Sequence, residues 1–296
     1  MTGDRPRRRE RLTRTRKTDM TNDFPPELLR GAKKISAGTG LTGLLWTDVK
    51  SQLSTPAREH LRATFPSVAV QAFTATTEQF WENWLSDEKL DELSGLVIVF
   101  DPAGLPVAWV ASNDRKFGGR RCFYANSAGV HPDYQGAGLS STIWRALLRS
   151  AIVKAAPRSL HAVMRTGNPL VYGAWSSATG RPDATWPAPG QAIPDHVQRI
   201  AADAAADLGQ ADRLDRRTLV ITDAYDDTET GLWTQRPTSD RTDIDEWFAS
   251  ILGPRDAIVL VVAFNPARIA IDEARRKIRR SLGLRKTPTR TSRTPT

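Results

Sequence analysis

The chain has 296 residues, of which 40% are hydrophobic and 25% are charged, and this composition is typical of a globular protein with a sizeable core. Its single cysteine, Cys122, excludes an intramolecular disulfide and a metal cage built from cysteines. No apolar run approaches the roughly 20 residues that span a bilayer, and the N-terminal arginines lack the apolar stretch of a secretory signal. We therefore expect a cytoplasmic protein that binds no metal.

The net charge of +9 is concentrated at the two ends of the chain. Residues 1–20 hold eight basic and three acidic residues, residues 275–296 hold nine basic and no acidic ones, and together they contribute +14, which leaves −5 for the rest. Both ends are too poor in apolar residues to fold alone. We predict a disordered basic tail over 1–24 and a helical or disordered basic tail over 275–296. These tails are either solvated ends or contacts for a polyanion such as RNA or DNA.

Hydrophobic patterning in the body of the chain predicts an alternation of strands and helices. In chain order we expect a helix over 56–62 after Thr55, a strand over 68–73, a helix over 76–85, strands over 96–100 and 106–110 joined by a turn, a strand over 121–126, a helix over 139–155, a strand over 160–164, a helix from Asn168, a helix over 195–208 and a buried strand over 257–264. This order is typical of an α/β or α+β layered domain.

Two closely spaced glycines lie between a predicted strand and the predicted helix over 139–155. Gly136 and Gly138 tolerate positive φ and lack a Cβ, so successive backbone N–H groups can converge on a phosphate oxygen. The start of the helix adds further N–H groups and the positive end of its dipole. The junction is therefore a candidate pyrophosphate site, and the alternative is a glycine turn that only joins a strand to a helix in some other α/β protein.

The spacing of the glycines distinguishes this loop from two known phosphate-binding loops. Neither the G-x-x-x-x-G-K-[ST] of a P-loop nor the G-x-G-x-x-G of a dinucleotide fold is present. The loop instead resembles the acetyl-CoA motif of the GNAT N-acetyltransferase superfamily, [RQ]-x-x-G-x-[GA] preceded by V-x-P-x-Y. The matching residues are Val130-His131-Pro132-Asp133-Tyr134-Gln135-Gly136-Ala137-Gly138-Leu139-Ser140. The sequence departs from the motif at Ser140, where the family has Gly or Ala.

This resemblance implies a GNAT-like fold, a mixed and mostly antiparallel sheet with a splayed strand pair, flanked by helices. We expect that domain over 25–274, with a core over 66–180, an extended region over 181–256 and a last strand over 257–264. The implied activity is N-acyl transfer with acetyl-CoA as the cosubstrate. A primary amine, on a small molecule or a protein, would attack the thioester directly, so no covalent enzyme intermediate is expected.

The resemblance also implies where acetyl-CoA binds. The residues expected to hold it are Val130, Gln135, Gly136, Ala137, Gly138, Leu139, Ser140 and Asn168. The strand through 127–130 would splay from the strand over 160–164, and the thioester arm would lie between the two strands. Backbone amides near Val130 would polarise the thioester carbonyl.

The candidate general acid lies on the helix that follows Asn168. The family often has a tyrosine seven residues after this asparagine, but Trp175 occupies that position. Tyr172 lies one turn earlier on the same helical face. We therefore expect Tyr172 to be either the acid or a core aromatic residue, and Trp175 to serve in packing or in the wall of the acceptor pocket.

The candidate general base is not a glutamate, because none lies between Arg121 and Val130, where the family often has one. The candidates are His131 itself, or water reached through Tyr124 or Asn126. The alternative for His131 is a surface residue of the loop.

Two functions of other classes stay open. The first is a catalytically weak CoA-binding domain with a structural or regulatory role, which Trp175 and the missing glutamate favour. The second is a nucleic-acid or ribosome-associated protein docked by its basic tails, although the charge of −5 in the body argues against direct groove binding.

Overall fold

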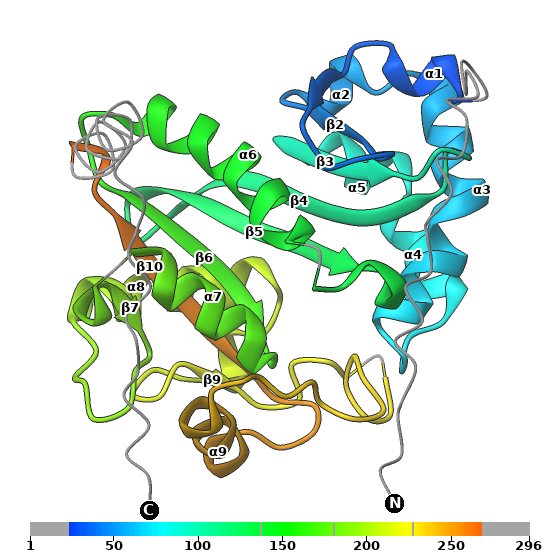
Figure 1. Ribbon diagram of the computed structural model, residues 1–296. Coiled ribbons are helices and arrows are strands. Elements are labelled where there is room, and N and C mark those ends of the chain that lie inside the picture. Colours follow the sequence, from blue (N-terminus) through cyan, green and yellow to red (C-terminus); the bar gives the residue numbers. More distant parts are fainter. Residues whose placement is uncertain (1–23, 137, 180, 227, 268–296) are drawn as a thin grey trace, which may run out of the picture.

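The computed structural model describes residues 24–267, apart from residues 137, 180 and 227 (Figure 1). The predicted tail over 275–296 and all but the last residue of the tail over 1–24 lie outside the described residues, so both tails stay predictions. Within the described ranges, no helix is both long and apolar enough to cross a bilayer.

A single mixed sheet forms the centre of the described part of the chain. Its ten strands are β1 (Lys33–Ile35), β2 (Thr42–Trp46), β3 (Gly95–Phe100), β4 (Pro106–Phe117), β5 (Arg120–Val130), β6 (Leu160–Thr166), β7 (Thr185–Trp186), β8 (Leu214–Asp215), β9 (Val220–Ile221) and β10 (Ala257–Phe264). The strand order is β1-β2-β3-β4-β5-β6-β10-β9-β8, and β7 also pairs with β10. All of these pairs are antiparallel except β5 with β6. The predicted mostly antiparallel sheet is therefore confirmed.

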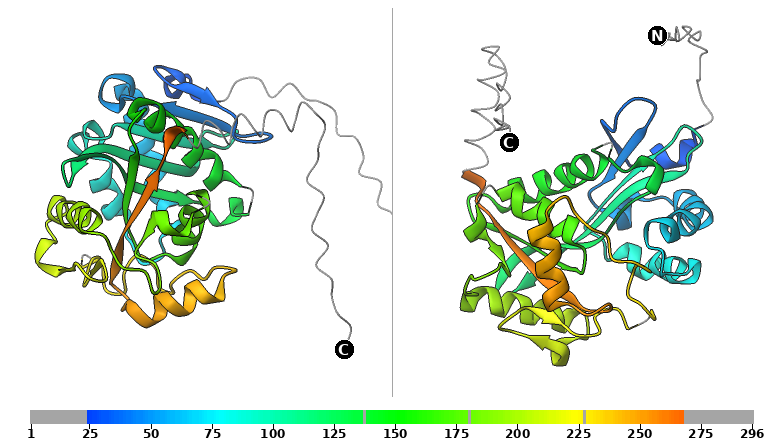
Figure 2. Two further views of the ribbon diagram at one scale, coloured as in Figure 1. Left: turned by 90° about the vertical axis from the view of Figure 1, so that its left-hand side faces the viewer. Right: turned by 60° about the horizontal axis from the view of Figure 1, so that its bottom comes forward.

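Helices cover both faces of this sheet (Figures 1 and 2). One face carries α6 (Leu139–Ala155), α7 (Pro169–Thr179) and α9 (Thr242–Ile251). The other face carries α3 (Thr55–Ala72) and α4 (Glu78–Trp84) over its N-terminal half and α8 (Asp195–Asp207) over its C-terminal half. The shorter elements are α1 (Pro26–Leu29), α2 (Val49–Gln52), α5 (Asp87–Asp91) and the 3-10 turns η1 (Pro132–Tyr134), η2 (Pro182–Ala184) and η3 (Ala211–Arg213). The sheet and its two helical coverings form three layers, and the predicted layered α/β domain is confirmed.

Helix α3 corrects the sequence prediction, which places a strand over 68–73. The helix continues through Pro66 and ends at Ala72. It buries a stripe at intervals of four residues, which is made of Leu61, Phe65, Ala69 and Phe73. This stripe packs on the sheet in one cluster with strands β2, β3 and β4. The predicted strand is wrong because burial of a helical stripe outweighs the β propensity of Val68 and Val70.

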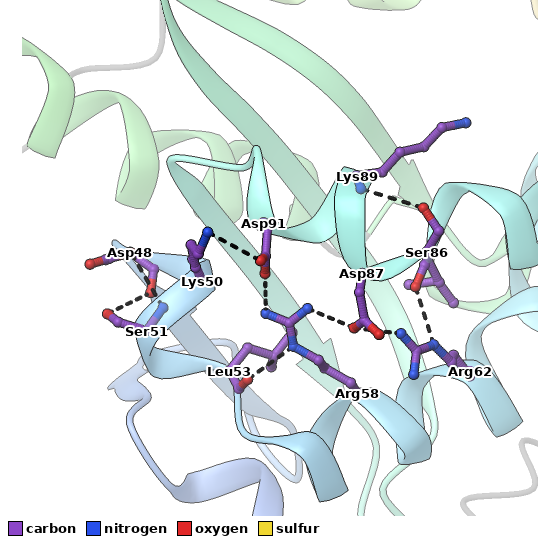
Figure 3. Close-up of polar contacts among 11 residues, drawn as sticks. Asp48, Lys50, Ser51, Leu53, Arg58, Arg62, Ser86, Asp87, Lys89 and Asp91 are labelled. Carbon is purple, nitrogen blue, oxygen red and sulfur yellow. Dashed lines mark hydrogen bonds and ion pairs between the residues drawn. The ribbon is translucent and has the colours of Figure 1, made fainter.

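A buried arginine ties three helices of the N-terminal half together (Figure 3). Arg58 of α3 is 8% exposed, and its Nε donates to the Leu53 carbonyl at 3.1 Å, directly after α2. Its Nη1 and Nη2 donate to the carboxylates of Asp87 at 2.8 Å and Asp91 at 2.6 Å, both in α5. These hydrogen bonds hold the pKa values of both carboxyl groups below their usual range. The cluster fixes α3, whose C-terminal end reaches the candidate site.

Candidate functional site

The neighbouring strands β5 and β6 diverge in the middle of the sheet. They pair over only three positions, from Cys122 with His161 to Tyr124 with Val163. Beyond Tyr124, both strands continue without pairing to each other, and β5 ends at Val130. The predicted splayed pair is therefore present, and we name the region between the two diverging strand ends the β5–β6 wedge (Figure 1).

A β-bulge in β5 lies just beyond the last position paired with β6. The register between β4 and β5 shifts after Ala111, which leaves Asn126 as an extra residue in β5. Trp84 Nε1 donates to Asn126 Oδ1 at 2.9 Å, and Trp109 Nε1 donates to Ser127 Oγ at 3.0 Å. Two indole N–H groups therefore hold two successive side chains of the bulge on the face that carries α3 and α4.

The last residues of β5 direct backbone donors into the wedge. The N–H of His131 donates to the Val107 carbonyl at 2.8 Å, across the ladder with β4. Because N–H groups alternate in direction along an antiparallel ladder, those of Ala128 and Val130 point the opposite way, toward the wedge. Donors with this orientation can stabilise negative charge on a carbonyl oxygen.

The glycine loop before α6 leaves open space beside its backbone. Gly136 and Gly138 have φ values of 77° and 75°, and a Cβ on either would meet nothing within 4 Å. Gly138 is the N-cap residue of α6 and provides no side-chain cap, so the N–H groups of Leu139 and Ser140 have no partner within the helix. Ala137 lies outside the described residues. An open loop and the positive end of a 17-residue helix together suit an anion.

The glycine loop is anchored at both ends. Gln135 Nε2 folds back to donate to the Val130 carbonyl at 3.2 Å, which ties the loop to β5. Leu139 is buried in the core beneath α6, whereas Ser140 is exposed. Of the residues predicted to bind the cofactor, Val130, Gln135, Gly136, Gly138 and Ser140 follow one another from the end of β5 to the first turn of α6, whereas the Leu139 side chain is buried in the core.

His131 connects the end of β5 to α3. Its Nδ1 accepts a hydrogen bond from the Asp133 N–H at 3.2 Å, and its Nε2 lies 2.8 Å from Gln71 Oε1. Because Nδ1 accepts the Asp133 N–H, these hydrogen bonds assign Nε2 as the donor to Gln71. Both ring nitrogens of the predicted base therefore have partners within the protein.

Asn168 and Tyr172 lie at the start of α7, on the other side of the wedge. Asn168 Oδ1 accepts from the Leu170 N–H at 2.9 Å, which stabilises the first turn of the helix. The ring of Tyr172 is buried against Trp247 and Phe248 of α9, with ring centroids 5.0 and 5.5 Å away. Burial raises the pKa of Tyr172 to about 12, so its hydroxyl is protonated at neutral pH.

Trp175 packs in the core between α6 and α7. Its ring lies edge-on to Trp144 of α6 at 4.8 Å and close to Phe123 of β5 at 6.5 Å. A tyrosine hydroxyl at this position would enter an apolar core, so the tryptophan suits its surroundings. The two expected roles of Trp175 are packing and the wall of the acceptor pocket, and these contacts are packing contacts.

Tyr124 and Cys122 face the core beneath α8. Burial raises the pKa of Tyr124 to about 12 and that of the Cys122 thiol to about 11. Both groups therefore keep their protons at neutral pH, and Cys122 is unsuited to act as a thiolate nucleophile. Across the described ranges, no three His, Cys, Asp or Glu side chains are grouped so that they could hold a metal ion.

Gly129 has no room for a side chain, because a Cβ there would lie 2.3 Å from the Trp109 ring. Trp109 is fully buried, so we expect Gly129→Ala to lower the free energy of unfolding by about 2 kcal/mol through overpacking. Urea denaturation measures this cost. Trp109→Phe shortens the ring, and in that background the cost of Gly129→Ala should fall below about 1 kcal/mol. Strictly additive effects of the two substitutions would contradict the explanation.

Comparison with known proteins gives a likeness in structure only. No protein-family model matches the chain, and no curated protein matches it. Among solved structures, the ribosomal-protein-S18-alanine N-acetyltransferase from Escherichia coli is 12% identical, with a TM-score of 0.38 and coverage of 75% of this chain and 93% of that one.

Two further solved structures are similar. An IAA acetyltransferase from Bacillus cereus is 8% identical, with a TM-score of 0.38 and coverage of 75% of this chain and 99% of that one. A GNAT family acetyltransferase from Brucella melitensis, in complex with acetyl-CoA, is 14% identical, with a TM-score of 0.31 and coverage of 41% and 74%. Because these identities and TM-scores are low, a functional proposal must rest on the geometry of this chain.

Proposed function

We propose that the chain is a GNAT-type N-acyltransferase that transfers acetyl from acetyl-CoA to a primary amine. The observation that carries this proposal is the divergence of β5 from β6 directly before an open glycine loop and an uncapped helix start. The diverging strand edges suit an extended arm that carries amides, since such an arm can hydrogen-bond to a strand edge. The glycine loop suits the pyrophosphate that follows such an arm in CoA.

In this proposal each part of the site has one role. The cosubstrate is bound by Gln135, Gly136, Ala137, Gly138, Leu139 and Ser140, with Val130 and Asn168 beside its arm. Of the backbone N–H groups that point into the wedge near Val130, that of Ala128 stabilises the oxygen of the thioester carbonyl while the amine adds to the carbon. The new C–N bond forms, the C–S bond breaks, CoA leaves as the thiolate, and the amine loses one proton.

The proton transfers are assigned to Tyr172 and His131. Tyr172 holds its proton at neutral pH, as a general acid for the leaving thiolate must. His131 is the candidate general base, because an imidazole nitrogen can accept a proton, but it must first release the Asp133 N–H from its Nδ1. The pH dependence of turnover in His131→Gln and Tyr172→Phe tests these two assignments.

A thermal melt with acetyl-CoA tests the cosubstrate. Saturating acetyl-CoA should raise the melting temperature, because a ligand that binds only the folded state stabilises it by mass action. Inorganic pyrophosphate serves as a control for weak anion binding. An unchanged melting temperature at millimolar acetyl-CoA would reject the proposed function.

Gly138→Ala should weaken acetyl-CoA binding about tenfold, because its Cβ would stand in space that the phosphates require. The matched control is Gly190→Ala, since Gly190 also has a positive φ, 69°, and open space beside it. Both variants should lose about 1 kcal/mol of stability from backbone strain, whereas only Gly138→Ala should change the Kd for acetyl-CoA. Equal Kd values for the two variants, measured by titration calorimetry, would argue against a phosphate at this loop.

A CoA-binding domain with little turnover is the second candidate function. It is favoured by the partners that engage both nitrogens of His131 and by the packing of Tyr172 against α9. Thiol release from acetyl-CoA with ethanolamine, 2-phenylethylamine and spermidine separates the two functions. Binding without thiol release above the background rate would favour the second candidate.

A further inference from the structure

The extra residue of the bulge, Asn126, lies two residues beyond the last position where β5 pairs with β6, on the face that carries α4. We propose that Asn126 binds the acceptor amine by accepting a hydrogen bond at Oδ1 from the amine nitrogen, and that Trp84 is the positioning residue that holds Asn126 for this role. This inference rests on the proposed function and adds the acceptor side of the same site.

A chain of hydrogen bonds sets the orientation of the Asn126 amide. Trp84 Nε1 donates to Asn126 Oδ1 at 2.9 Å, and Asn126 Nδ2 donates to Asn113 Oδ1 at 3.1 Å. Asn113 is 1% exposed, and its own Nδ2 donates to the Glu92 carbonyl at 2.7 Å. Because an indole N–H can only donate and a carbonyl can only accept, the direction of every link is determined. The amide of Asn126 therefore cannot flip without breaking two hydrogen bonds.

Asn126 retains hydrogen-bonding capacity after these contacts. A side-chain amide oxygen can accept two hydrogen bonds, and its NH2 group can donate two. Among the described residues, Trp84 occupies one acceptor position of Asn126 and Asn113 occupies one donor position. Asn126 is exposed, unlike the buried Asn113 at the next link. A preorganised hydrogen-bond acceptor on an exposed side chain suits a ligand that carries N–H groups.

The bulge separates the two partners of the reaction onto opposite faces of β5. Asn126 and Ser127 contact tryptophans on the face of α3 and α4, whereas Ala128 and Val130 pack toward α6. An acetyl-CoA arm in the wedge can meet the Ala128 N–H, two residues along β5 from Asn126, while an amine approaches the thioester from the α4 face. Such an approach from one side is what direct attack on the thioester carbon requires.

The amide of Asn126 orients the amine but does not take its proton. A neutral amine that donates one N–H to Asn126 Oδ1 keeps its lone pair for the thioester carbon. The C–N bond then forms, the C–S bond breaks with its electron pair going to the CoA sulfur, and the extra proton on nitrogen leaves to a base or to water. An asparagine therefore suffices for binding and orientation.

Steady-state thiol release with ethanolamine, 2-phenylethylamine and spermidine tests this inference. Asn126→Ala should lower kcat/KM for the amine roughly tenfold, the effect of one lost hydrogen bond, and leave the Kd for acetyl-CoA unchanged. Trp84→Phe keeps an aromatic ring against Phe65 but removes the indole N–H that donates to Asn126. It should therefore lower kcat/KM for the amine about threefold. Asn83→Ala, at an exposed asparagine of α4, is the matched control and should change neither quantity.

The outcomes separate this inference from the proposed function. A wild type that does not bind acetyl-CoA rejects both. A wild type that binds acetyl-CoA but transfers to none of the three amines rejects the acceptor role of Asn126 and leaves the cofactor site standing. A parallel loss of acetyl-CoA affinity in Asn126→Ala, or kinetics equal to those of Asn83→Ala, also overturns it. Melting temperatures of Asn126→Ala and Trp84→Phe show whether a loss of kcat/KM reflects misfolding. Trp84→Phe is the milder of the two substitutions and provides the second test.

Discussion

Arg58→Ala is expected to lower the free energy of unfolding by about 3 kcal/mol, because it removes one partner of a buried ionic cluster. The substitution leaves the Leu53 carbonyl without its donor and the carboxylates of Asp87 and Asp91 without their guanidinium. These carboxylates are 60% and 33% exposed, so water replaces part of what is lost and the cost stays at the lower end of the range for buried pairs. Equilibrium unfolding in urea at neutral pH measures the change.

Two further variants identify the cause of the Arg58 effect. Arg58→Met refills most of the volume and should cost less than Arg58→Ala, since apolar residues often replace buried ion pairs at small cost. Arg121→Ala removes a surface ion pair in which Arg121 Nη2 lies 2.5 Å from Asp114 Oδ2. It should lower the free energy of unfolding by less than about 1 kcal/mol. An Arg58→Ala protein no less stable than Arg121→Ala would show that the cluster in Figure 3 does not stabilise the N-terminal helices.

Acidification from pH 6.5 to pH 4 is expected to cost about 3 kcal/mol of unfolding free energy through His161 alone. His161 is 3% exposed, and burial, followed by the charges of Arg120 and His196, lowers its pKa to about 4. The unfolded chain takes up a proton on this histidine near its usual pKa of about 6.5, while the folded chain does so only near 4. The free energy of unfolding therefore falls as the pH falls through this window, and the loss is complete below the folded pKa.

The His161 contribution is measured as a difference in slope. Unfolding free energies at pH 7, 5.5 and 4.5 should fall less steeply in His161→Phe than in the wild type, whatever the variant does to stability at pH 7. His196→Phe should also make the fall less steep, but by less than His161→Phe does, because the His196 ring lies 6.0 Å from that of His161, is only partly buried and is one cause of the lowered His161 pKa. The carboxyl groups of Asp87 and Asp91, whose pKa values are lowered, lose their contribution below about pH 4, outside this window. Identical slopes in wild type and His161→Phe would refute the assignment.

Local patterning predicts most elements around the candidate site. Leu139, Ile143 and Leu147 recur every four residues, and α6 forms with the predicted bounds and buries all three. Gly136 and Gly138 mark the loop that precedes it, because their positive φ values are local properties of glycine. The predicted strand over 257–264 coincides with β10, since a short apolar run of β-branched residues suits a strand buried on both faces.

Elements whose stability is tertiary are not predicted or are predicted wrongly. The strands β1 and β2, the short strand β7 and the helix α9 are missing from the sequence prediction. β7 has only two residues, and it exists because Thr185 and Trp186 pair with β10. The helical residues 68–73 are read as a strand because Val68 and Val70 favour extended backbone when their packing partners are unknown.

The chain by itself determines the order of its elements, the chemistry of the glycine loop and the position of its charges. Only the tertiary structure decides where β5 leaves β6, which residue the bulge adds, and which donors hold that bulge. The donor and acceptor of the Trp84–Asn126 bond are 42 positions apart, and those of the Trp109–Ser127 bond are 18 apart. Periodicity along a sequence reports which face of an element is buried, but strand register and divergence depend on contacts between distant segments. The sequence marks Asn126 as a candidate site residue, but only the folded chain provides the hydrogen bonds that orient its side chain.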